Sequence, residues 1–139
     1  MPAKVLIVDD EADFLDLVAH NLDPRLYDVL TANDGVEALN KARQYLPDVI
    51  LLDLMLPDLD GFSVCEILRH QPSTANIPIV IVTAMSGELP RFSALGSGAT
   101  CVLRKPVNMN HLRESVAIAA APSQAEAQSD QLTDDRVGR

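Results

Sequence analysis

Short, unbroken apolar runs alternate along this chain with segments of helical period, and this alternation restricts the fold more than any other feature. The central runs are rich in valine, isoleucine and leucine without polar alternation, as strands buried on both faces require. The expected strands span residues 4–8, 27–32, 49–53, 79–83 and 100–103. Strands separated by helices predict βαβ units, so we expect an α/β fold with a parallel sheet.

Five further segments carry helical spacing or helical end signals. The first, residues 13–22, predicts a buried helix face made of Phe14, Leu17, Val18 and Leu22, interrupted only by Asn21. In the second, Asp34 and Glu37 form a box-like cap, and the helix is expected to end near Leu46, before Pro47. The remaining three are expected over residues 62–70, over residues 88–96, and from Asn108 or Asn110 to Ala121.

The composition restricts the size and the partners of the protein. Its 139 residues, 47% hydrophobic and 22% charged, suffice for one domain, expected over residues 1–121. The polar residues 122–139 are expected to form a disordered tail or the start of a linker. The net charge of −9 argues against non-specific binding to nucleic acid or to an anionic membrane.

Two further features concern the cellular compartment. The chain has neither an apolar stretch near the roughly 20 residues of a membrane span nor the zones of a signal peptide, so we expect a cytoplasmic protein. Cys65 and Cys101 fall in an expected helix and an expected strand, and we expect both to be reduced core thiols.

Three aspartates stand where buried strands are expected to end. Asp9 and Asp10 follow the first apolar run, and Asp53 closes the third. In a parallel α/β sheet, the carboxyl ends of the strands form the edge where ligands bind. Carboxylates gathered at this edge repel one another, which favours a bound divalent cation. Each aspartate taken alone is equally consistent with a strand terminator or a helix cap.

Two more polar residues fall on the same edge, because Thr83 ends the fourth expected strand and Lys105 follows the fifth. A family resemblance rests on Asp9-Asp10-Glu11, residues 51–61 around Asp53, Thr83-Ala84 and Lys105-Pro106. In this order and spacing, the chain resembles the receiver domain of two-component response regulators over about residues 3–121. The resemblance implies a flavodoxin-like, doubly wound sheet of five parallel strands in the order 2-1-3-4-5, with five helices.

The resemblance also implies a Mg²⁺ site. Asp10 would bind the ion directly and Asp9 through water, and Asp53 with the backbone carbonyl of Met55 would complete the protein ligands. Mg²⁺ suits such a site because it prefers a few carboxylates and retains several waters.

The phospho-acceptor implied by the resemblance is Asp53, acting as the nucleophile. Thr83 would donate a hydrogen bond to the phosphoryl group, and Lys105 would supply positive charge from a cis Lys105-Pro106 segment. A phosphoryl group in transfer carries charge on three oxygens, so catalysis is mostly positioning and charge neutralisation. Gly61 would allow a close turn beside the acceptor.

A protein of this kind is a switch rather than an enzyme, although it assists its own phosphorylation and dephosphorylation. The phosphoryl group would come from a sensor histidine kinase or a histidine phosphotransfer protein, and it would bias one of two conformations. The face of the fourth helix, fifth strand and fifth helix would contact a downstream protein, or a second copy in a homodimer. Two interpretations stay open: a receiver that acts alone, or the receiver part of a larger regulator, with the chain from Pro122 onward as the start of its cut linker.

One position departs from the family pattern. Receivers usually carry tyrosine or phenylalanine three residues before the lysine, and this chain has Val102. An aliphatic side chain cannot make the rotation that couples to the threonine. We therefore expect the signal to pass through the loop after Thr83 and through the fourth helix.

A rival hypothesis is a Mg²⁺-dependent phosphatase of the haloacid dehalogenase type. That enzyme needs a second aspartate two residues after the nucleophile, where this chain has Met55, and its nucleophile follows the first strand. A flavin-binding module of the same fold would need a phosphate-cradling loop after the first strand, where the acidic Asp9-Asp10-Glu11 would repel a phosphate.

Overall fold

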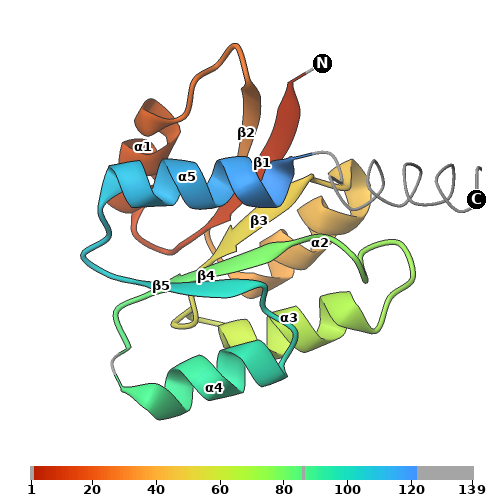
Figure 1. The fold of residues 1–139 in the computed structure, drawn as a ribbon. Coiled ribbons are helices and arrows are strands. Elements are labelled where there is room, and N and C mark those ends of the chain that lie inside the picture. Colours follow the sequence, from red (N-terminus) through yellow and green to blue (C-terminus); the bar gives the residue numbers. More distant parts are fainter. Residues whose placement is uncertain (1, 86, 122–139) are drawn as a thin grey trace, which may run out of the picture.

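The computed structural model describes residues 2–85 and 87–121, which form a five-stranded parallel sheet with helices on both faces (Figure 1). The strands are β1 (Ala3–Val8), β2 (Tyr27–Ala32), β3 (Val49–Leu52), β4 (Ile79–Thr83) and β5 (Cys101–Arg104). The helices are α1 (Ala12–Asn21), α2 (Gly35–Tyr45), α3 (Gly61–Arg69), α4 (Glu88–Gly96) and α5 (Met109–Ala120). The strand order is β2-β1-β3-β4-β5, which confirms the order implied by the resemblance.

Two hydrophobic clusters pack on the two faces of the sheet. Helices α1 and α5 cover one face, and α2, α3 and α4 cover the other (Figure 1). Residues of the central strand β3 alternate between the two clusters, and all four are buried. The unbroken apolar runs are thus explained, because every side chain of such a strand meets a helix layer.

Each expected element boundary lies within one residue of the observed one. The third strand ends at Leu52, so Asp53 is the first residue beyond it. The second helix ends at Tyr45 because Leu46 adopts a left-handed conformation, with φ 48°, and Pro47 cannot extend a helix. At its start, the Asp34 side chain accepts a hydrogen bond from the backbone N–H of Glu37, as expected for a cap. The fifth helix is capped by Asn108, one of the two candidates from the sequence.

The buried face of α1 differs from the predicted one. Leu15, Val18 and Leu22 are buried, while Leu17 is 48% exposed. Two overlapping stripes, one through Leu17 and one through Leu15, satisfy helical spacing in this sequence. The choice between them depends on how α1 is seated on β1 and against α5, which the sequence pattern does not specify.

Both cysteines are free thiols among the described residues. Cys65 lies buried in α3, as expected, whereas Cys101 in β5 is only half-buried. None of the helices within residues 2–85 and 87–121 has the length and apolarity needed to cross a membrane. The predicted tail over residues 122–139 lies outside the described residues.

The geometry of α1 makes a direct prediction for two leucines. Leu15→Ala removes a buried side chain and should lower the free energy of unfolding by about 2–4 kcal/mol. Leu17→Ala removes a half-exposed side chain and should cost less than about 1 kcal/mol. Urea denaturation of both variants measures the difference, and a larger loss in Leu17→Ala than in Leu15→Ala would mean that α1 presents the face first predicted.

Candidate functional site

The three aspartates of the sheet edge come together in the structure. Their carboxylate oxygens lie within 4.8 Å of one another, with Asp9 and Asp53 buried and Asp10 exposed. The backbone explains the meeting. Strand β1 lies between β2 and β3, and the N–H of Asp53 donates to the carbonyl of Val8 at 3.0 Å. The ends of β1 and β3 therefore leave the sheet at the same level. The predicted cluster is therefore a feature of the sheet topology.

One oxygen of each buried carboxylate is held by the local backbone. Oδ1 of Asp9 accepts a hydrogen bond from the N–H of Glu11 at 2.9 Å. In the same way, Oδ1 of Asp53 accepts from the N–H of Met55 at 3.1 Å. These bonds fix both side chains and leave the second oxygen of each free to meet a cation.

Within the described residues, the ammonium group of Lys105 pairs with these second oxygens. Its Nζ lies 2.6 Å from Oδ2 of Asp9, 3.4 Å from Oδ2 of Asp53 and 3.7 Å from the Glu11 carboxylate. The ammonium group also lies 4.2 Å from the centre of the Phe14 ring, within cation–π range. The Lys105-Pro106 bond is cis, which confirms that expectation.

These neighbours alter the protonation of Lys105. Burial alone would lower its pKa, because desolvation disfavours the charged form. The hydrogen bond to Asp9 and the charges of Asp53 and Asp9 together outweigh burial, and the pKa of Lys105 is raised. The side chain is therefore a stable ammonium ion at neutral pH.

The donor set fits a hard divalent cation. The three clustered carboxylates are accompanied by a single ammonium group, that of Lys105, which also meets Glu11, so acidic side chains outnumber the basic one at this site. Carboxylate oxygens are the ligands that Mg²⁺ prefers, and the exposed position of Asp10 leaves room for bound water. Asp9, Asp10 and Asp53 are the residues that would hold the ion.

Thr83 ends β4 at the same edge and is buried, with 1% of its surface exposed. Its Oγ1 accepts a hydrogen bond from the N–H of Met85 at 3.2 Å. A hydroxyl group that accepts one bond still has its own proton to donate. The next residue, Ala84, is small and exposed, which leaves the approach to the site open.

Gly61 at the start of α3 makes the close turn that the sequence predicted. Its N–H donates to the carbonyl of Leu54 at 2.9 Å. A Cβ at this position would lie 2.6 Å from the carbonyl oxygen of Asp53 and 2.6 Å from the Cα of Leu54. The chain after Asp53 therefore turns tightly against the helix that follows it.

Two neighbours of the site were not assigned to it from the sequence. Glu11 contributes a carboxylate near Lys105, and Phe14, expected only as a core residue of α1, carries the ring beside the ammonium group. The position of Glu11 directly after two aspartates was the available signal. No sequence pattern indicates that a ring on α1 meets a lysine after β5.

Comparison with known proteins finds relatives with this architecture. Residues 5–117 match the response regulator receiver domain family. The response regulator PleD of Caulobacter vibrioides is 44% identical over 108 residues, which are 78% of this chain and 24% of that protein. The alkaline phosphatase synthesis transcriptional regulatory protein PhoP of Bacillus subtilis is 39% identical over 137 residues, which are 99% of this chain and 56% of that protein.

Solved structures of response regulators also match this fold. The chemotaxis response regulator CheY4 of Vibrio cholerae has a TM-score of 0.80 at 34% identity, and the match covers 86% of this chain and 99% of that one. Both of these relatives are longer than this chain, which spans about a quarter of PleD and about half of PhoP.

The raised pKa of Lys105 predicts an alkaline limit to its contribution. A group with a raised pKa contributes stability that is fully present below its ordinary value of 10.5 and is lost as pH rises through the folded value. Lys105→Met in metal-free buffer should lower the free energy of unfolding by roughly 3 kcal/mol, because buried carboxylates lose their partner. Urea denaturation from pH 7 to 11 should show this difference shrinking only above the ordinary pKa. A difference that already shrinks between pH 7 and 9 would contradict the assignment.

Proposed function

The chain belongs to the response regulator receiver domain family, and we propose that it is a phosphorylation switch whose acceptor is Asp53. One observation carries the proposal. The buried carboxylate of Asp53 lies in a cluster with two further aspartates and within 3.4 Å of an ammonium group. The match to the receiver family favours this proposal over the phosphatase hypothesis.

The proposed reaction is transfer of a phosphoryl group to Asp53. A carboxylate oxygen of Asp53 attacks phosphorus while the phosphorus–nitrogen bond of a partner's phosphohistidine breaks, and the imidazole leaves with the electron pair. The product is an acyl phosphate on Asp53. Bound Mg²⁺, held by Asp9, Asp10, Asp53 and the carbonyl of Met55, would supply positive charge to the phosphoryl oxygens.

The side chains around Asp53 have separate tasks in this reaction. Lys105 already pairs with both buried aspartates, so its ammonium group can pair with a phosphoryl oxygen beside Asp53 after a small movement. The Thr83 hydroxyl donates its free proton to a second phosphoryl oxygen. The N–H of Met55 keeps the Asp53 carboxylate oriented before attack. The fold thus assists a transfer in which the phosphoryl donor is another molecule.

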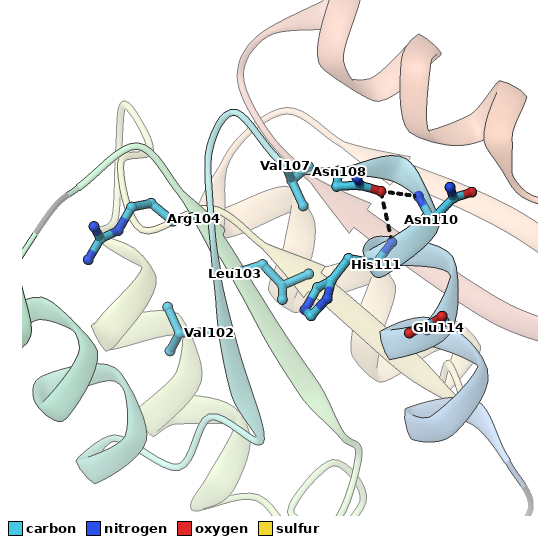
Figure 2. A pocket seen from close by; sticks show the side chains of 8 residues that line it. All are labelled: Val102, Leu103, Arg104, Val107, Asn108, Asn110, His111 and Glu114. Carbon is cyan, nitrogen blue, oxygen red and sulfur yellow. Dashed lines mark hydrogen bonds between the residues drawn. The ribbon is translucent and has the colours of Figure 1, made fainter.

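The proposed donors are a sensor histidine kinase or a histidine phosphotransfer protein, and the proposed location is the cytoplasm. The output is proposed to leave through the face of α4, β5 and α5. A cavity of about 490 Å³ opens there between β5 and α5, lined by Val102, Leu103, Arg104, Val107, Asn108, Asn110, His111 and Glu114 (Figure 2). Its lining combines apolar side chains with Arg104 and Glu114, which suits a protein partner, either a downstream target or a second copy.

A second cavity supports a route by which the signal could reach this face without an aromatic residue at position 102. It has a volume of about 200 Å³ and lies between the end of β4, α4 and β5, lined by Thr83, Met85, Gly87, Pro90, Arg91, Val102 and Arg104. Val102 leaves this space open, so inward movement of Thr83 can draw the loop after β4 and the start of α4 toward it. We propose this backbone movement as the route of the signal.

The proposal is tested by intact mass after incubation with a small phosphodonor and Mg²⁺. The wild type should gain one phosphoryl group, whereas Asp53→Asn should gain none because an amide oxygen is a poor nucleophile. Thr83→Ala should still gain the group, more slowly. No gain in the wild type, with Mg²⁺ binding shown separately, would contradict phosphorylation by small donors.

The same phosphorylated sample tests the route of the signal. Backbone hydrogen exchange should change in Glu88–Gly96 and Cys101–Arg104, while Gly35–Tyr45, on the far side of α3, should stay unchanged. Unphosphorylated Asp53→Asn in the same buffer is the control. A change confined to the residues around Asp53 would mean that the face of α4, β5 and α5 does not report phosphorylation.

A further inference from the structure

The loop between β3 and α3 is tied to a helix distant in sequence. Asp58, in this loop, accepts a hydrogen bond from the N–H of Gly35 at 2.7 Å and another from the N–H of Val36 at 2.9 Å. Both donors belong to the first turn of α2. The Gly35 bond is the largest influence on the pKa of Asp58, which is lowered, so the side chain is a carboxylate.

Asp58 completes the N-terminus of α2. The first N–H groups of a helix lack partners within it. The first intrahelical bond of α2 runs from the N–H of Ala38 to the carbonyl of Asp34, and the Asp34 side chain accepts from Glu37. The two remaining donors, on Gly35 and Val36, are those that Asp58 takes. The helix thus offers a specific two-pronged seat for the loop.

The contact at this seat is too close for a side chain at position 35. A Cβ on Gly35 would lie 2.7 Å from the Cβ of Leu59 and 3.1 Å from a methyl group of Val64. Gly35 is buried, and Leu59 packs against the core. The backbone of α2 at Gly35 therefore lies directly against the side chain of Leu59 in the loop, and no space is left for the loop to shift along the helix.

The loop held in this way is the one that carries the reaction groups. It begins at Asp53, includes Met55, whose N–H orients the Asp53 carboxylate, and ends at Gly61 against Leu54. Gly61 pins the two ends of the loop together. Asp58 is the polar side chain between them that fixes the loop to another element.

We propose that Asp58 is a positioning residue for the metal centre, holding the β3–α3 loop on α2 so that Asp53 and the carbonyl of Met55 face Asp9 and Asp10. The proposal rests on the function proposed above. Asp58 does not touch the ion. It sets the geometry of the groups that do, and its loss lets the loop move and weakens binding.

The test is the dissociation constant for Mg²⁺, measured by calorimetric titration of the full chain. Asp58→Ala should bind Mg²⁺ at least fivefold more weakly than the wild type. Asp34→Ala is the matched control, because it removes the same charge and a cap from the same helix without touching the loop. It should bind within twofold of the wild type. Equal affinities in Asp58→Ala and wild type, or equal losses in both variants, would overturn the proposal.

Gly35→Ala separates position from charge. It keeps every carboxylate but drives a Cβ into Leu59, so it should weaken Mg²⁺ binding about as much as Asp58→Ala. Faster hydrogen exchange at the Met55 amide is expected in both variants and not in Asp34→Ala. Wild-type affinity in Gly35→Ala, with an unchanged Met55 amide, would overturn the proposal.

Failure of this inference is distinct from failure of the proposed function. If the wild type accepts a phosphoryl group and Asp58→Ala binds Mg²⁺ normally, only the role of Asp58 is lost. If Asp58→Ala loses Mg²⁺ affinity while the wild type accepts no phosphoryl group, the positioning role stands and the function falls. A wild type that binds no Mg²⁺ overturns the metal centre and with it the role of Asp58.

Discussion

The pairing of Lys105 with two buried carboxylates is the interaction on which the site depends. Asp9 and Asp53 are almost fully buried, and carboxylates in such places are costly without a cation. The ammonium group of Lys105 lies closer to Asp9 than to Asp53, so Asp53, the proposed acceptor, is the less firmly paired of the two. An incoming cation or phosphoryl group can therefore change how Lys105 is shared between Asp9 and Asp53.

The parallel sheet makes this balance possible at low structural cost. Because β1 lies between β2 and β3, two apolar strands deliver their next residues to one point at the sheet edge. The helices need only cover the two faces, and the chemistry is left to the loops that follow the strands. Close backbone contact at Gly61 then keeps the loop after Asp53 compact beside the cluster.

The sequence predicted what depends on local pattern. Apolar runs located the strands, and carboxylates and Lys105 at strand ends located the acidic cluster, because both follow from short stretches of chain. It failed for the inner face of α1, where Leu15 and Leu17 offered equally good stripes. It also could not show that Phe14 meets Lys105 or that Asp58 binds the start of α2, since these contacts join segments that only the folded chain brings together.

The most direct test of this account is the thermal stability of the protein in Mg²⁺ compared with Na⁺ at matched ionic strength. If the acidic edge is a divalent cation site, Mg²⁺ should raise the Tm of the wild type in a saturable way, because only the folded state assembles the ligands. Asp10→Asn, at an exposed position, should lose most of that rise without loss of the fold. An equal rise with Na⁺, or an undiminished rise in Asp10→Asn, would contradict the account.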